Sequence, residues 1–187
     1  MSGEAPHGRS AELIYVGFGG NEGGEGAIRQ RFRAAARSLA ALPYVQSVAQ
    51  SSLYLTAPQG PFRDQAPFVN ALVAIEAPQA PEPSAVLATL LAIEADLGRD
   101  RAEEQPLGPR PIDLDLLLYG PRAERSPGPP ATEVPHPRLG ERAFALAPLA
   151  EVAGRDLWLP GVEATVGQRL ADVMVRAQPV SWLSADW

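Results

Sequence analysis

The sequence predicts an α/β protein of the α+β type, in which helices pack on a mainly antiparallel sheet. Three observations support this prediction. Short apolar runs bounded by glycine and proline indicate strands, two longer segments carry apolar residues at helical spacing, and these elements follow the order β-α-β-β-α-β. This order is typical of a ferredoxin-like core. Right-handed crossovers then place both helices on one face of the sheet.

The first strand is expected at 12–18, where the sequence is apolar and aromatic. The glycine-rich run 19–26 follows it and allows a tight turn into a helix, with Asn21 stabilising that turn. The run does not match the phosphate-binding patterns it resembles at first sight. The chain contains no lysine, and Glu22 stands where the third glycine of a dinucleotide-binding loop would be.

A helix is predicted over 27–42, ended by Pro43, because its apolar residues recur at the helical period: Ile28, Phe32, Ala35, Leu39 and Leu42. The alternating segment 45–55 predicts the second strand, and the β-rich run 68–76 predicts the third.

The second helix is expected to begin with Ser84 as its cap and to end at Gly98. Its apolar residues face one side: Val86, Leu90, Ile93 and Leu97. The last core strand lies within the stretch GPRPIDLDLLLYG, residues 108–120.

Segments after residue 120 are predicted to add to this core. They comprise a Pro/Gly-rich stretch at 121–137, helices near 147–153 and 165–177, and an apolar C-terminal end, VSWLSADW. We expect them to pack on the same core. The sequence therefore predicts a single domain over 11–187, preceded by a disordered tail at 1–10.

The composition excludes several function classes. The 187 residues carry a net charge of −6, which argues against a general nucleic-acid-binding protein, and no apolar run is long enough to span a membrane. All 16 basic residues are arginine, which excludes lysine Schiff-base chemistry, and the two histidines, His7 and His136, cannot form a multi-histidine zinc site. The absence of cysteine and of a secretory signal leads us to expect a cytoplasmic protein.

Asp113 and Asp115 are the most informative residues. Successive side chains of a strand point to opposite faces, so the two carboxylates share one face with Leu117 and Tyr119, while the other face carries Ile112, Leu114, Leu116 and Leu118. Two like charges on a half-buried surface repel, and a divalent cation would relieve that repulsion. The alternative is a solvated strand face.

Three arginines precede the aspartates: Arg99, Arg101 and Arg110. Because the guanidinium group binds phosphate oxygens with a planar pair of donors, arginines beside a metal site favour a polyphosphate ligand. The segments 56–67 and 99–111 are longer than ordinary connections, which indicates binding loops or lids, with tolerated insertions as the alternative.

Other candidates have a functional and a structural interpretation. Asn70 lies in an apolar strand, where its amide either reads the edge of a heterocycle or is a satisfied structural group. Phe68, two residues earlier, and Phe144 either stack on that heterocycle or belong to the core. His136 lies between two prolines, where it either contacts phosphate or belongs to a surface loop.

Six stretches together resemble the successive motifs of a known family, 6-hydroxymethyl-7,8-dihydropterin pyrophosphokinase of folate biosynthesis: YVGFGGN, SSLYLTAPQGP, FVNALVAIE, IEADLGRDR, GPRPIDLDLLLYG and VPHPRLGERAFALAPLAEVA. The resemblance covers about residues 13–153. It implies a ferredoxin-like fold and a reaction that moves the terminal pyrophosphoryl group of ATP to the pterin hydroxymethyl group and releases AMP. ATP and the pterin would be its small-molecule partners.

The resemblance also implies roles for individual residues. Asp113 and Asp115 would hold two Mg²⁺ ions that bridge the phosphates of ATP, the co-substrate. Arg99, Arg101 and Arg110 would contact or gate these phosphates. The remaining ATP-binding residues would be Glu94, Leu116, His136 and Arg142, and the pterin would be bound by Thr56, Gln59, Phe68, Asn70 and Phe144.

One departure from the family pattern lies in the loop before the aspartates. Many members carry Arg-Trp there, whereas this chain has Gln105 to Leu107, so that either Arg99 and Arg101 suffice, with Leu107 shielding the pterin, or closure is weakened. The alternatives to the pyrophosphokinase are a nucleotidyltransferase that releases pyrophosphate and a non-catalytic binding module. We expect no essential histidine base, no nucleic-acid or membrane partner, and a monomer, with a dimer as the alternative.

Overall fold

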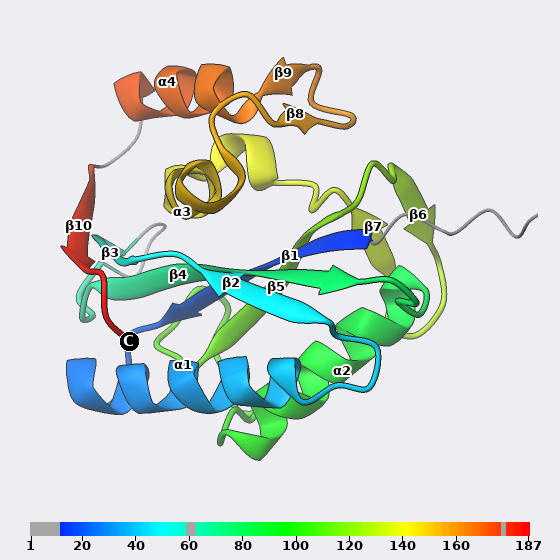
Figure 1. Cartoon of the computed structure of the whole chain (residues 1–187). Helices are drawn as coiled ribbons and strands as arrows, with labels where there is room; N and C mark the ends of the chain where they lie inside the picture. Colours follow the sequence, from blue (N-terminus) through cyan, green and yellow to red (C-terminus); the bar gives the residue numbers. More distant parts are fainter. Residues whose placement is uncertain (1–11, 59–62, 177–178) are drawn as a thin grey trace, which may run out of the picture.

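A computed structural model describes residues 12–58, 63–176 and 179–187 (Figure 1). The predicted tail at 1–10 and the pterin-binding candidate Gln59 lie outside the described residues. Within the described part of the chain, no helix is both long and apolar enough to cross a membrane.

The predicted βαββαβ order is present. Its elements are β1 (Glu12–Gly20), α1 (Gly24–Ala40), β2 (Ser47–Gln50), β3 (Leu53–Thr56), β4 (Phe68–Ala77), α2 (Pro83–Asp96) and β5 (Asp113–Tyr119). They build a six-stranded antiparallel sheet in the order β10-β3-β4-β1-β5, in which β2 also pairs with β4. The additions after β5 are β6 (Glu124–Ser126), β7 (Thr132–Val134), a 3₁₀ helix η1 (Leu139–Glu141), α3 (Ala143–Ala153), β8 (Trp158–Leu159), β9 (Ala164–Thr165), α4 (Val166–Arg176) and β10 (Val180–Ser184).

The strand predicted at 45–55 is divided into β2 and β3. The reason lies at Ser51, whose hydroxyl accepts a hydrogen bond from the Leu72 N–H at 2.9 Å, where a strand would use a backbone carbonyl. Ser52 donates its N–H to Glu151 of α3 instead of to the sheet. The sheet therefore accommodates an irregularity between the two short strands.

Helices cover both faces of the sheet, and α1 and α2 lie together on one face as predicted (Figure 1). They bury a continuous cluster with the sheet, including Ile28, Phe32, Leu39, Val86 and Leu90. On the opposite face, α3 and α4 bury a second cluster that includes Leu146, Leu149 and Val173. The prediction of one shared core is therefore wrong for α3 and α4, because the antiparallel sheet has two apolar faces to cover.

Several predicted helix boundaries were also wrong. The first helix begins at Gly24 instead of residue 27, and α3 begins at Ala143 instead of near residue 147. The second helix begins at Pro83, with no capping bond from Ser84, because proline has a helical φ and no N–H to satisfy in the first turn. Gly98 does end that helix, with a φ of 91°.

A β-bulge at Leu117 changes which side chains face each core. Val16 pairs with Leu116 and Tyr15 with Leu118, so Leu117 is an extra residue on β5. After it, Leu118 lies in the cluster beneath α3, and Tyr119 lies in the cluster beneath α1 and α2. The predicted faces of Leu118 and Tyr119 were therefore wrong, because one extra residue reverses the alternation of a strand.

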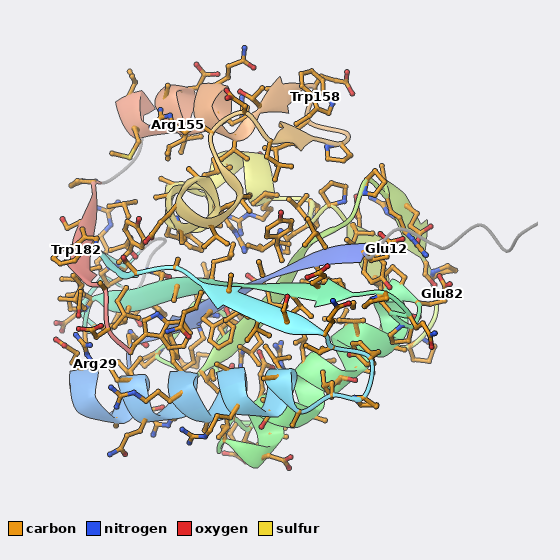
Figure 2. The ribbon with its side chains drawn as sticks, viewed as in Figure 1. Glu12, Arg29, Glu82, Arg155, Trp158 and Trp182 are labelled. Carbon is orange, nitrogen blue, oxygen red and sulfur yellow. The ribbon has the colours of Figure 1, made fainter. Side chains whose placement is uncertain are left out.

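The C-terminal end returns to the first core. β10 pairs with β3, and the ring of Trp187 lies 5.6 Å from Phe18 and 5.7 Å from Phe32, centroid to centroid. Its indole N–H donates to the Ser51 carbonyl at 2.6 Å, and Arg29 of α1 donates to the Asp186 carbonyl. Arg29 and the outward-pointing Trp182 of β10 lie at the same end of the molecule (Figure 2).

We predict that Trp187→Ala lowers the free energy of unfolding by about 3 kcal/mol, because the side chain is 7% exposed and its removal leaves a cavity beside the rings of Phe18 and Phe32. Urea denaturation measures this change. Trp182→Ala is the matched control, since that side chain is 63% exposed and its loss should change stability by less than about 0.5 kcal/mol. Equal losses in the two variants would contradict a core role for the C-terminal residue.

Candidate active site

The largest group of predicted site residues surrounds one cavity of about 410 Å³. Its walls come from β1, β3, β4 and β5, the loop 99–111 and the start of α3. Residues that line it include Thr56, Phe68, Asn70, Arg99, Arg101, Leu107, Arg110, Asp113, Asp115, Arg142 and Phe144. The structure thus brings together residues that are up to 88 positions apart in the sequence (56 to 144).

A second cavity, of about 500 Å³, adjoins the first and shares Arg101 and Asp115 with it. Leu116 and His136, both predicted to bind ATP, lie here with two leucines of α2, Leu87 and Leu91. The aspartate strand therefore has a cavity on either side of its charged end. One cavity contains the aromatic candidates, and the other has an apolar wall.

Glycines on β1 keep the floor of the first cavity open. Gly17 pairs with Asp115 and Gly19 with Asp113, and a Cβ atom on Gly19 would lie 3.6 Å from the Asp113 Cβ and 3.7 Å from Asn70 Oδ1. Gly23 and Gly24, with φ of 85° and 82°, make the predicted turn into α1. The glycines therefore leave space beside the aspartates and also form the turn into α1. The sequence predicted only the turn.

Asp113 and Asp115 lie side by side, and their closest contacts are with different basic side chains. Asp113 contacts Arg99 through one oxygen and lies 3.3 Å from the Arg110 guanidinium through the other. Asp115 accepts a hydrogen bond from Arg142 at 2.9 Å and lies 4.0 Å from the His136 ring.

These surroundings shift the pKa values of the two carboxyl groups in opposite directions. Burial by itself would raise the pKa of Asp113, but Arg110 and Arg99 hold that pKa below its ordinary value. Burial and the neighbouring charge of Asp113 raise the pKa of Asp115, and Arg142 offsets this only in part. The positive charges around Asp115 therefore compensate its negative charge less fully than those around Asp113 do.

Glu94 is a buried carboxylate that binds two arginines of the first cavity, Arg99 and Arg101. Its side chain is 1% exposed and accepts hydrogen bonds from Arg99 at 2.8 Å, from Arg101 at 2.6 and 2.9 Å, and from the Leu114 N–H at 2.7 Å. Burial raises its pKa, and these donors oppose that effect. Glu94 was predicted to lie at the nucleotide site, and in the structure it is connected to the first cavity through Arg99 and Arg101.

Arg99 is the most enclosed cation of the site, with a side chain that is 4% exposed. Beyond Glu94 and Asp113, its Nε and Nη2 donors bind Glu104 at 2.9 to 3.1 Å. Burial by itself would lower the pKa of Arg99, but Glu104 and Asp113 raise it above its ordinary value. The edge of the guanidinium group that best suits a phosphate is thus occupied by a carboxylate of the loop.

The two long loops meet above the cavity and are tied together by side-chain amides. Asn21 accepts the N–H of Arg110 at 3.0 Å and donates to the Ala66 carbonyl and to Gln65, both at 2.9 Å. Gln65 donates in turn to the carbonyl of Leu107 at 3.0 Å. The turn-stabilising residue predicted from the sequence therefore also joins the loops.

His136 is held as a neutral ring. Its Nδ1 accepts the backbone N–H of Arg138 at 3.0 Å, which leaves the proton on Nε2. Burial lowers the pKa of His136, and Arg142 adds to this effect while Asp115 opposes it. A neutral imidazole with its proton on Nε2 suits a hydrogen-bond donor better than a base.

A family model for 7,8-dihydro-6-hydroxymethylpterin-pyrophosphokinase (HPPK) matches residues 15–154. The chain belongs to this family. It is 40% identical over 149 residues to 2-amino-4-hydroxy-6-hydroxymethyldihydropteridine pyrophosphokinase of Pseudomonas aeruginosa, over 80% of this chain and 85% of that protein. The protein of the same name from Methylorubrum extorquens is 41% identical over 158 residues, covering 84% and 90% of the two chains. The family and the enzyme class predicted from the sequence are confirmed.

Solved structures support the fold. A crystal structure of an HPPK-DHPS in complex with substrates aligns with a TM-score of 0.68 over 88% of this chain, at 11% identity. A wild-type Plasmodium falciparum HPPK-DHPS aligns with a TM-score of 0.66 over 89%, at 12% identity. This chain spans 44% and 45% of those two chains. The predicted ferredoxin-like fold is confirmed.

In this HPPK family member, the aromatic end of the first cavity is formed by Phe68 and Phe144. A guanidinium group lies over each ring, Arg110 at 5.1 Å from Phe68 and Arg142 at 5.5 Å from Phe144. Asn70 lies in one cross-strand row with Asp113, because Asn70 pairs with Gly19, which pairs in turn with Asp113. Its amide donates to Thr56 Oγ1 at 2.9 Å and to the Phe68 carbonyl at 3.3 Å.

Several residues of the site were not singled out by the sequence. Gly17 and Gly19 open the floor, while Glu104 and Gln65 hold the loops. The role of the two glycines follows from the pairing of β1 with β5, which the sequence alone does not specify. Glu103 and Glu104 are adjacent in the sequence, and only the folded loop decides which of them reaches Arg99.

We predict that asparagine substitutions of the two aspartates shift stability in opposite directions at neutral pH without added metal. A lowered pKa means that the fold favours ionised Asp113, so this stability is present above its unfolded pKa and Asp113→Asn loses it. A raised pKa means that the fold disfavours ionised Asp115, so Asp115→Asn removes a penalty. Thermal denaturation should give a lower Tm for the first variant and a higher Tm for the second. Shifts of the same sign would contradict the assigned electrostatics.

We predict that Glu104→Gln loosens the loop 99–111. The substitution weakens charge-assisted hydrogen bonds to Arg99, which should speed amide hydrogen exchange in the loop about ten-fold. Mass spectrometry of peptides from the loop measures the exchange. Glu103→Gln is the matched control, since that side chain is exposed and should leave exchange unchanged. Equal exchange in both variants would show that Glu104 does not hold the loop.

Proposed function

We propose that this pyrophosphokinase binds the pterin in the first cavity and the nucleotide in the second, and joins them at Asp113 and Asp115. The observation that carries this proposal is the pair of adjoining cavities that share Arg101 and Asp115. The reaction transfers the pyrophosphoryl group of ATP to 6-hydroxymethyl-7,8-dihydropterin and releases AMP. Both substrates must approach the same charged boundary, and the shared residues supply it.

The pterin would lie between Phe68 and Phe144, where two aromatic faces offer stacking surface. Asn70 and Thr56 are buried polar groups at this end, bonded to each other at 2.9 Å. Such a pair favours a heterocycle whose edge carries both donors and acceptors. A cross-strand row of paired residues runs from Asn70 through Gly19 to Asp113. A pterin bound at Asn70 would extend its hydroxymethyl group along this row toward the phosphates.

ATP would lie across the second cavity. The apolar wall formed by Leu87, Leu91 and Leu116 suits the adenine base, and His136 can donate its Nε2 proton to a phosphate oxygen. Arg101 and Arg142 lie toward the aspartates, with Arg101 exposed and the Arg142 guanidinium beside Asp115. Arg110 has a buried Nε without a partner among the described residues, which is a donor available to a phosphate.

Two Mg²⁺ ions fit the chemistry of the aspartate pair. Asp113 and Asp115 present hard carboxylate oxygens on one face, and a cation would offset the burial and the Asp113 charge that raise the pKa of Asp115. Among the described residues, no group of three or more histidine, aspartate or glutamate side chains is arranged to hold a metal, so substrate phosphates would complete the ligand set. When bound, Mg²⁺ would neutralise charge on the phosphates.

The residues of the chain act mainly by positioning and charge. The pterin hydroxyl oxygen loses its proton to water and forms a bond to the β-phosphorus, while the bond from that phosphorus to the α,β-bridging oxygen breaks and AMP leaves with that oxygen. Arginines at the boundary of the cavities stabilise the charge that develops on the leaving phosphate. The neutral His136 would act here as a hydrogen-bond donor through Nε2, and the absence of an essential histidine base stays a prediction. The monomeric state and the cytoplasmic location stay predictions.

We predict that incubation with Mg·ATP and 6-hydroxymethyl-7,8-dihydropterin yields AMP and the pterin diphosphate, identified by chromatography of the nucleotide products. Asp113→Ala and Asp115→Ala should each lower kcat at least about a hundred-fold. Asp172→Asn, on the exposed surface of α4, is the control and should retain full activity.

Release of pyrophosphate in place of AMP would indicate a nucleotidyltransferase. Binding of both substrates without turnover would indicate a non-catalytic module. Full activity in both aspartate variants would contradict the assignment of the metal-binding residues.

A further inference from the structure

Helix α3 carries a single side chain that can form hydrogen bonds. Its sequence, AFALAPLAEVA, is otherwise apolar, and Glu151 is the exception. The helix lies over the sheet on the face opposite α1 and α2 (Figure 1). Because apolar contacts are non-directional, they hold α3 against the sheet without fixing its rotation or its position along its own axis. A hydrogen-bonded carboxylate supplies the directional contact that is otherwise missing.

Glu151 binds three donors at and just before the start of β3. Its two oxygens accept the Ser52 N–H at 2.9 and 3.1 Å, one of them accepts the Ser52 hydroxyl at 2.7 Å, and the other accepts the Tyr54 hydroxyl at 2.9 Å. Burial raises the pKa of Tyr54 to about 12, and Glu151 adds to this effect, so the phenol remains a donor at neutral pH. Hydrogen bonds to an ionised acceptor are roughly twice as strong as those between neutral groups.

The strand that Glu151 binds continues into the first cavity. Alternate residues of a strand share a face, so Thr56 lies on the same face of β3 as Tyr54. In the neighbouring strand β4, Tyr54 pairs with Asn70 and Thr56 pairs with Phe68. The Asn70 amide in turn donates to Thr56 Oγ1 at 2.9 Å. Glu151 therefore holds the cross-strand partner of Asn70.

The opposite side of that cavity is formed by α3 itself, through Phe144. Phe144 and Glu151 are seven residues apart, which is about two helical turns, so both lie on one face of α3. The bonds of Glu151 to β3 therefore join the helix that carries one aromatic ring to the strands that carry the other ring and the polar pair. Glu151 is not among the described residues that line the cavity.

We propose that Glu151 is a positioning residue for the pterin, because its bonds to Ser52 and Tyr54 fix the spacing between α3 and the strands β3 and β4. It acts through the residues on either side of the cavity and does not touch the substrate. This inference rests on the proposed function and adds to it the residue that sets the width of the pterin site.

Glu151→Gln tests the inference, because glutamine keeps the shape of the side chain but has one acceptor oxygen in place of two and no charge. The Kd for 6-hydroxymethyl-7,8-dihydropterin should rise about three- to ten-fold, as expected for the loss of one or two hydrogen bonds. Calorimetric titration in the presence of Mg²⁺ and α,β-methylene-ATP, which cannot transfer its pyrophosphoryl group, measures this Kd.

The nucleotide is the internal control for a merely structural effect. None of the described residues that line the second cavity belongs to α3 or β3. The Kd for α,β-methylene-ATP, titrated in the presence of Mg²⁺ and without the pterin, should therefore stay within about two-fold of the wild type in Glu151→Gln. Asp156→Asn, an exposed carboxylate beyond the end of α3, should leave both Kd values unchanged.

Tyr54→Phe is a milder variant that removes one donor to Glu151 and keeps the ring. It should raise the pterin Kd about two- to three-fold. When Glu151→Gln is already present, the same substitution should have a smaller effect, because both changes break the same contact. Tyr54→Phe alone decides the point if Glu151→Gln does not fold.

An unchanged pterin Kd in Glu151→Gln or in Tyr54→Phe would overturn the inference. Equal rises in the Kd for the pterin and for the nucleotide would also overturn it, because they would indicate a general loss of structure. Both results differ from a failure of the proposed function, in which the wild-type chain itself would not bind the pterin.

Discussion

The repulsion between Asp113 and Asp115 is the constraint on which the rest of the site depends. Two carboxylates on neighbouring positions of one strand face are unfavourable in a half-buried environment, and the surrounding structure compensates the two unequally. Arg99 and Arg110 compensate Asp113, whereas Arg142 compensates Asp115 only in part. The remaining negative charge supports the proposal that a cation binds here together with a polyphosphate.

Arg99, which compensates the negative charge of Asp113, is itself bound by further carboxylates. This arginine is enclosed by three carboxylates, one from the end of α2, one from β5 and one from the loop itself. Because Glu94 is buried and also bonds the Leu114 N–H, the second helix, the aspartate strand and the loop are joined at one point. An arginine that the sequence suggested as a phosphate ligand is, in this structure, also the centre of the loop's attachment.

The two faces of the sheet have different roles. Gly17 and Gly19 leave space beside the aspartates on the face that carries the cavity, while α1 and α2 fill the other face. The bulge at Leu117 ends the alternation that places the aspartates together, and returns Tyr119 to the core beneath the helices. Local departures from regular structure, at Ser51, Leu117 and Leu107, all lie at or next to strands and loops that form the site.

The element order, the ferredoxin-like core and the charged face of β5 could be predicted from the amino-acid pattern, because helical and strand periodicities and the alternation of side chains are local properties. Together with the family motifs, this pattern also predicted residues that the fold gathers around the two cavities. Three features could be seen only in the folded chain: Glu104 binds Arg99 while the adjacent Glu103 is exposed, α3 and α4 cover the far face of the sheet, and Leu107 adopts a left-handed conformation. These features depend on contacts between segments far apart in the chain, and on the pairing of one strand with another, which no local pattern specifies.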